Sequence, residues 1–153
     1  MSVAFRLEGD EEHKEPTFEL PIPPGPNLVT VRGKALIDAK VTELETGVAT
    51  CADEESAAPL RRELRYWHTR QVTAEIAPTP PDGEVGIGSH VTFTLNGAER
   101  AVTIVGGDEA DPAAGLIGFQ APLARALLGG SVGEQLPFGG REDAIEVLTV
   151  EPA

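Results

Sequence analysis

Apolar residues recur with helical spacing in two stretches of the first half of the chain. In residues 30–48 they are separated by four, three and four positions, the spacing of a coiled-coil seam, at Ile37, Val41, Leu44 and Val48. Residues 57–76 repeat the four-three spacing at Leu60, Leu64 and Trp67. Thr30 and Ser56 are suitable N-caps for the two helices, and Pro59 is expected in the first turn of the second. The pattern predicts an antiparallel helical hairpin, a short coiled coil with an acidic loop at its tip.

The second half of the chain alternates apolar and polar residues as β-strands do. Strands over 90–95 and 100–105 flank Asn96-Gly97, a strong signal for a tight hairpin. Three more strands are expected over 116–120, 135–138 and 145–150, and a short helix is expected from Pro122 to Leu128, before Gly129-Gly130. We therefore predict a small antiparallel sheet with one helix across it, which gives an α+β fold for the whole chain.

Charge and proline content set the first 27 residues apart. They contain the charged run DEEHKE and the sequence PIPPGP, which cannot enter a helix or a central strand. We expect a flexible arm there, and the alternative is an arm that docks through Phe18, Leu20 and Ile22, which alternate as in a strand. Prolines near residue 80 then separate the two folded halves. The predicted organisation is an arm over 1–27, a helical hairpin over 28–78 and a sheet domain over 79–153.

Composition narrows the class of protein. Cys51 is the single cysteine, so no internal disulfide forms, and the N-terminus is acidic where a signal peptide would be basic and then apolar. No apolar run approaches the roughly 18 residues that cross a membrane, and we expect a cytoplasmic monomer. The net charge of −13 argues against autonomous binding to duplex DNA. Seven of the 12 basic residues lie in residues 28–78.

The acids of the predicted hairpin tip are the main candidates for chemistry. Asp53, Glu54 and Glu55 could complete the coordination of a Mg²⁺ ion held mainly by another protein, since Mg²⁺ takes oxygen ligands and retains waters. A metal so held can activate water to cut a phosphodiester. The alternative is a solvated loop whose charge favours the N-terminus of the second helix. The histidines and Cys51 show no ligand spacing, so we expect no metal or cofactor of the protein's own.

Arginines on the second predicted helix are candidates for steering. Arg61, Arg62 and Arg65 could guide the hairpin toward RNA, such as an RNA 3′ end, or toward an acidic surface of a partner. The alternative is a solvated face paired with Glu63 and with acids of the first helix. Trp67 falls on the seam and is expected to pack rather than to stack on a base.

Several segments of the sheet domain resemble, in order, the C-terminal domain of the Gre transcript cleavage factors. They are IGSHVTF at 87–93, Ile104-Val105-Gly106 followed by Asp108-Glu109-Ala110-Asp111, APLARAL at 121–127, and Val132-Gly133-Glu134. The resemblance implies an FKBP-like α+β fold. It also implies docking at the rim of the secondary channel of RNA polymerase, for which the candidate residues are Asp108, Glu109, Asp111, Pro122, Leu123 and Arg125.

The hairpin resembles the same family less closely. Thr30-Val31-Arg32-Gly33 is similar to the T-x-x-G that opens the Gre coiled coil, whereas the tip, Ala52 to Ser56, departs from the family's G-D-L-x-E-N. The short hairpin resembles the nucleoside diphosphate kinase regulator branch. The resemblance therefore implies a polymerase-binding regulator of transcription elongation, a modulator or competitor and not itself an enzyme.

Three alternatives to this function remain open. The first is an active transcript cleavage factor, which would use the tip carboxylates to complete the Mg²⁺ site of the polymerase. The second is an FKBP-like peptidyl-prolyl isomerase, although Phe93, Phe119 and Phe138 are the only aromatic residues from residue 79 on, and a proline pocket needs aromatic walls. The third is an interaction module for another partner.

Overall fold

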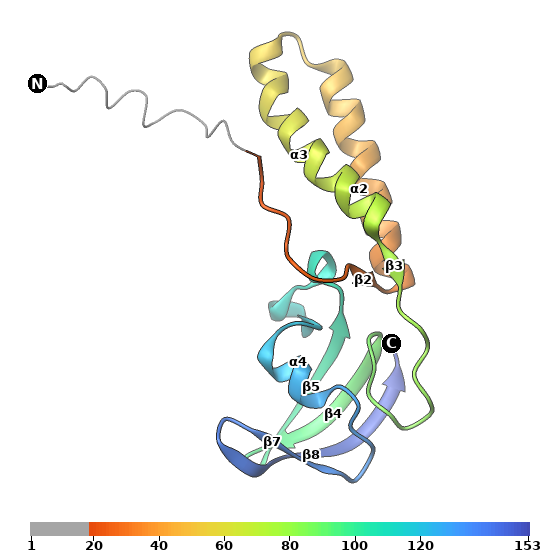
Figure 1. The fold of residues 1–153 in the computed structure, drawn as a ribbon, viewed down its shortest axis with the longest axis vertical. Helices are drawn as coiled ribbons and strands as arrows, with labels where there is room; N and C mark the ends of the chain where they lie inside the picture. The colour runs from red at the N-terminus through yellow and green to blue at the C-terminus, as the bar shows by residue number, and fades with distance from the viewer. Residues whose placement is uncertain (1–18) are drawn as a thin grey trace, which may run out of the picture.

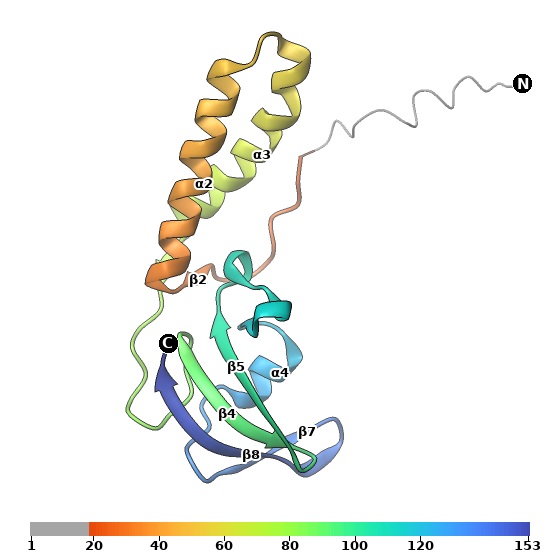
Figure 2. The same cartoon turned by 180° about the vertical axis from the view of Figure 1, so that it is seen from behind.

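The computed structural model describes residues 19–153, in which a long helical hairpin projects from a small sheet domain (Figures 1 and 2). The predicted run DEEHKE and Phe18 lie outside the described residues. Within them, no helix is both long enough and apolar enough to span a membrane.

The hairpin consists of two antiparallel helices, α2 (Val31–Thr50) and α3 (Glu54–Thr73). Thr30 is the N-cap of α2, as predicted, and its hydroxyl accepts a hydrogen bond of 2.9 Å from the backbone N–H of Gly33. The predicted seam of α2 is confirmed at Ile37, Val41 and Leu44, which are buried. The other predicted seam positions are only partly buried: Val48, Leu60, Leu64 and Trp67. Each helix has 20 residues and so spans about 30 Å.

The start of α3 differs from the prediction. Asp53, not Ser56, is the N-cap, and Ser56 lies in the first turn, where its backbone N–H donates to Asp53 Oδ1 at 2.7 Å. Pro59 therefore lies inside the helix and not in its first turn. Asp and Ser are both favoured N-cap residues, so the sequence alone allows either position. In the structure the helix begins at Glu54, which makes Asp53 the residue that caps it.

The sheet has the order β6-β5-β4-β8-β7. Its strands are β4 (Ser89–Leu95), β5 (Ala98–Val105), β6 (Leu116–Gly118), β7 (Gln135–Phe138) and β8 (Arg141–Pro152). The tight hairpin between β4 and β5 is confirmed, with positive φ at Asn96 and Gly97. The prediction of an all-antiparallel sheet is wrong, because β5 and β6 are parallel. Two 3-10 turns, Gly107–Glu109 and Pro112–Ala114, carry the chain back so that β6 enters in the direction of β5.

The core of the sheet domain lies between the sheet and α4 (Pro122–Leu127), which covers one face (Figure 1). Phe93, Ile104, Leu127, Ile145 and Val147 are fully buried there. The helix ends one residue before the predicted end, and Gly129 follows with a φ of 85°.

Two short strands that the sequence did not indicate form the base of the hairpin. β2 (Leu28–Val29) comes just before α2 in the chain, and β3 (Glu75–Ile76) comes just after α3. The two strands pair in parallel. Upstream of β2, residues 19–26 form no strand, while Asn27 is buried. The last residue of the predicted arm is therefore packed into the base of the hairpin.

Candidate functional site at the hairpin tip and at its base

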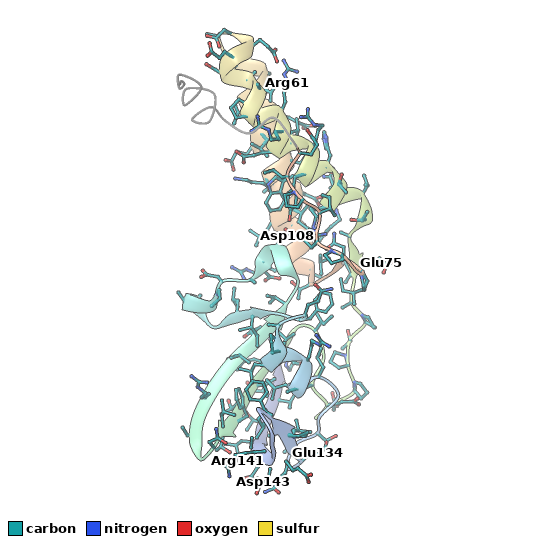
Figure 3. The ribbon with its side chains drawn as sticks, turned by 60° about the vertical axis from the view of Figure 1, so that its left-hand side comes forward. Arg61, Glu75, Asp108, Glu134, Arg141 and Asp143 are labelled. Carbon is teal, nitrogen blue, oxygen red and sulfur yellow. The ribbon has the colours of Figure 1, made fainter. Side chains whose placement is uncertain are left out.

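The tip of the hairpin carries the three predicted acids, and two of them have local partners. Asp53 caps α3, and the hydrogen bond from the Ser56 N–H holds the pKa of the Asp53 carboxyl below its ordinary value. Glu54 lies 3.1 Å from the guanidinium of Arg61 (Figure 3), and Glu55 is exposed. Within residues 19–153 no group of three His, Cys, Asp or Glu side chains is arranged to hold a metal ion. A role of these carboxylates toward a metal ion bound by a partner stays a prediction.

The arginines of α3 have acidic neighbours other than those expected. Arg61 pairs with Glu54, and Arg65 makes a two-pronged contact with Glu19, at 2.7 Å from Nη2 to Oε2. The Arg65 hydrogen bond lowers the pKa of Glu19, with a smaller contribution from the charge of Arg62. Arg61 and Arg65 thus pair with Glu54 and Glu19 and not with Glu63, so that part of the alternative is wrong for these two residues. The contact of the arginines with RNA stays a prediction.

A buried polar cluster, which we call the joint, holds the base of the hairpin against the sheet domain (Figure 3). Asp108 accepts hydrogen bonds of 2.6 Å from both Arg70 Nε and the Tyr66 hydroxyl. The side chains of Arg70 and Asp108 are only 6% and 10% exposed. Asn27 completes this half of the joint, since it accepts from Arg70 Nη2 at 2.8 Å and donates to the Arg70 carbonyl at 2.9 Å.

Burial in the joint also raises the pKa of the Tyr66 hydroxyl. The pKa of Tyr66 is raised to about 12, first because the phenol is partly buried and then because it donates to the Asp108 carboxylate. A phenolate beside a carboxylate would be doubly unfavourable, so the neutral phenol is the form that the joint holds.

Glu109 forms the other half of the joint. Its side chain is 4% exposed and accepts hydrogen bonds from the Thr30 hydroxyl at 2.6 Å and from Arg32 Nη1 at 3.0 Å. A Cβ at Gly33 would lie 2.8 Å from Glu109 Oε1, so a side chain there would require the Glu109 carboxylate to shift. The buried carboxylate of Glu109 therefore lies at the N-terminus of α2, where a negative charge is favoured.

Gly106 lies where the sheet domain comes very close to the base of the hairpin. A Cβ at Gly106 would lie 2.5 Å from the carbonyl oxygen of Leu28 in β2, which is far inside van der Waals contact. The sheet domain thus touches the backbone of the hairpin base directly. Gly106, Asp108 and Glu109 come from one short segment, which therefore contacts β2, α3 and the start of α2.

The predicted polymerase-binding residues therefore fall into two groups. The carboxylates of Asp108 and Glu109 point into the joint, whereas Asp111, Pro122 and Arg125 are exposed and Leu123 is half-buried beside the core. Sequence reasoning did not find Asn27, Tyr66 and Arg70 as partners of the joint, and only the T-x-x-G at residue 30 hinted at a special start of α2. Contact of either group with a partner stays a prediction.

Together these features define a class of protein: a small α+β domain from which a charged helical arm projects. The description of the family that matches residues 80–152 is "Transcription elongation factor, GreA/GreB, C-term". The GreA factor of Thermomicrobium roseum is 44% identical over 67 residues, which cover 42% of this chain and 43% of that protein. GreA of a Bacillus anthracis strain is 42% identical over 71 residues, which cover 44% of this chain and 45% of that protein. Residues 80–152 are thus similar to the GreA/GreB C-terminal domain family, and the chain spans less than half the length of these curated relatives.

Solved structures with similar folds are more distant in sequence. The GreA factor homolog 1 (Gfh1) of Thermus thermophilus matches with a TM-score of 0.38 and 16% identity, covering 83% of this chain and 99% of that one. A GreA/GreB elongation factor from Nitrosomonas europaea matches with a TM-score of 0.40 and 19% identity, covering 83% and 98%.

Proposed function

We propose that the protein binds bacterial RNA polymerase and regulates transcription elongation, with the sheet domain at the rim of the secondary channel and the hairpin inside it. The observation that carries the proposal is the family match over residues 80–152, combined with a helical arm fixed to that domain. The relatives are named as transcription elongation factors. On this proposal the protein acts in the cytoplasm, on the polymerase and without catalysis of its own.

The geometry of the tip favours a modulator or competitor over an active cleavage factor. Asp53 is committed to capping α3 and Glu54 is paired with Arg61, which leaves Glu55 as the tip acid without a local partner among the described residues. A Mg²⁺ ion shared with the polymerase needs oxygen ligands in near-octahedral positions, and misplacement by about 1 Å can cost around a hundredfold in rate. An arm of about 30 Å with this tip would occupy the channel and exclude other factors.

The exposed group of predicted residues supplies the surface for the polymerase. Asp111, Pro122 and Arg125 lie on the turn and the helix that flank β6, away from the buried carboxylates of the joint. The joint would set the angle at which the hairpin leaves this surface.

A binding titration tests the proposal. Full-length protein should bind core RNA polymerase, and Arg125→Glu should weaken that binding about tenfold or more, because an exposed charge at a contact is reversed. Arg100→Glu on β5 is the matched control, since it makes the same change on an exposed strand. Lack of binding by the unmodified protein would reject the proposal, and equal loss in both variants would reject the assigned surface.

A cleavage assay on backtracked RNA decides between the competitor and the cleavage factor. We expect little or no cleavage with the unmodified protein, together with displacement of an authentic GreA factor. The informative variants are Asp53→Ser/Glu55→Ala and Asp53→Ser alone, because serine keeps an N-cap while it removes the charge. Robust cleavage that Asp53→Ser/Glu55→Ala abolishes would overturn the competitor role and make these acids ligands of the shared Mg²⁺.

A further inference from the structure

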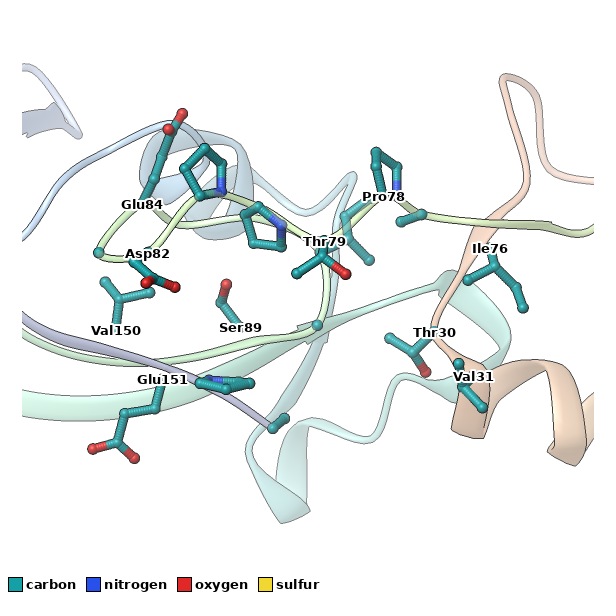
Figure 4. Close-up of a pocket in the computed structure, with 18 of the residues that line it drawn as sticks. Thr30, Val31, Ile76, Pro78, Thr79, Asp82, Glu84, Ser89, Val150 and Glu151 are labelled. Atoms are coloured by element: carbon teal, nitrogen blue, oxygen red, sulfur yellow. The ribbon is translucent and has the colours of Figure 1, made fainter.

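A groove of about 420 Å³ lies between the base of the hairpin and the sheet domain (Figure 4). We call it the linker groove, because the linker of residues 77–84 forms one wall. The rest is formed by residues of β2 and β3, the start of α2, residues 87–89 and the end of the chain from Val150. None of its lining residues belongs to α4 or to the turn of Asp108 and Asp111, so it is separate from the surface proposed for the polymerase.

The walls of the linker groove are largely apolar and remain accessible. Pro78, Pro80 and Pro81 supply rings and no backbone N–H, so this wall offers carbon and few donors. At the hairpin end Val31 and Ile76 are 71% and 55% exposed, far more than the buried residues of either core. Apolar side chains left open beside a groove can bury surface against another molecule.

The charges around the groove all have one sign. Asp82, Glu84 and Glu151 line it, and no lysine or arginine of the described chain does. Within residues 19–153 none of the three acids has an ion pair, whereas Asp38 of the hairpin is paired with Lys34. In Figure 4 the Asp82 carboxylate lies toward Val150 and Ser89, whereas the carboxylates of Glu84 and Glu151 point outward on opposite sides of the view. An occupant with positive charge would therefore gain attraction that the protein itself does not supply.

The backbone beside the groove also has an open side. In the described part of the chain β3 pairs only with β2, through the backbone N–H groups of Glu75 and Ala77. The backbone N–H and C=O of Ile76 therefore point away from β2, and no other strand pairs with them. An extended peptide can add to such an edge.

We propose that the linker groove binds an extended segment of a partner protein in which apolar side chains alternate with lysine or arginine. The apolar side chains would lie against the prolines and Ile76, and the cations would face Asp82, Glu84 and Glu151. RNA does not fit, because three carboxylates repel phosphates. The proposal goes beyond the polymerase function and does not depend on it.

Fluorescence anisotropy with a defined probe tests the proposal. The probe is a fluorescein-labelled octapeptide of alternating valine and arginine, titrated with the full-length protein at about 50 mM and 200 mM salt. We expect saturable binding that weakens at the higher salt. An octapeptide of alternating glycine and arginine should bind at least about tenfold more weakly, because it lacks the apolar side chains. Equal binding of the two peptides, or no saturable binding of the first, would overturn the proposal.

Charge-matched variants show whether binding occurs in the groove. Asp82→Asn/Glu84→Gln/Glu151→Gln should bind the valine–arginine peptide about tenfold more weakly, as expected for three exposed charge contacts. The control is Glu99→Gln/Glu142→Gln/Glu146→Gln, which removes the same charge from exposed positions outside the groove. The peptide should also shift the NMR amide signals of Ile76 and Val150 in the unmodified protein. Equal weakening by both triple variants, or shifts confined to α4, would show binding elsewhere and reject the groove.

Discussion

Replacing Asp108 by asparagine should loosen the joint between the hairpin and the sheet domain. The asparagine would keep the size of the side chain but remove the charge that faces Arg70, whose side chain is 6% exposed. The Tyr66 hydroxyl and Arg70 Nε, both 2.6 Å from the carboxylate, would then share a neutral amide group. The change therefore leaves a buried cation with too few acceptors.

The magnitude follows from what remains around Arg70. Removing one partner of a buried ion pair costs about 3–5 kcal/mol. Asn27 Oδ1 still accepts from Arg70 Nη2 at 2.8 Å, and the new amide oxygen can accept one hydrogen bond, so the cost falls at or just below the lower end of that range. We expect a loss of about 2–3 kcal/mol in the free energy of unfolding, a large part of the roughly 5–15 kcal/mol of a typical domain.

Urea unfolding of the full chain measures this loss, and Asp111→Asn is the matched control. Asp111 lies in the same acidic turn, is exposed and has no ion pair among the described residues, so its substitution should change the free energy by no more than about 0.5 kcal/mol. A cycle with Tyr66→Phe should show coupling, because Tyr66 and Arg70 share Asp108.

Hydrogen exchange locates the effect. In Asp108→Asn the amides at the end of α3, near Arg70, should exchange faster, while those of β4 and β8 should keep their protection. Equal stabilities of Asp108→Asn and Asp111→Asn would refute the joint as a stabilising ion pair. Uniform loss of protection in both parts would refute its local character.

Two further predictions test the same region. The pKa of Tyr66 is raised from 10.0 to about 12 in the folded protein, so its contribution to stability is complete below pH 10 and is lost as the pH rises toward 12. Because Tyr66 is the only tyrosine, ultraviolet absorbance should show one transition near pH 12 that moves toward pH 10 in urea, and a folded transition near pH 10 would contradict the buried hydrogen bond. Gly106→Ala should lower the free energy of unfolding in urea by about 1–3 kcal/mol, because the added Cβ would meet the Leu28 carbonyl oxygen. Gly107→Ala is the control and should be near neutral, since an added Cβ there would have no neighbouring atom within 4 Å. Equal losses of stability in the two variants would show that the base of the hairpin shifts to accept the added methyl group.

The sequence by itself determined the elements that depend on neighbours along the chain. The seam of α2 follows from apolar spacing, the N-cap at Thr30 from a hydroxyl three residues before Gly33, and the β4–β5 turn from Asn96-Gly97. Each of these patterns repeats within a few positions of the chain, so a short stretch of sequence is enough to predict the element. Where two local signals competed, as at Asp53 and Ser56, sequence reasoning chose wrongly.

Only the tertiary structure decided how the parts meet. Asp108 and Glu109 read as a surface acidic motif, yet their carboxylates are buried against residues 38 and 79 positions away, Arg70 and Thr30. The parallel pairing of β6 and the linker groove likewise depend on segments distant in sequence. A carboxylate has the same side chain whether it faces water or a buried guanidinium, and its role follows from the partner that the fold brings within hydrogen-bond distance.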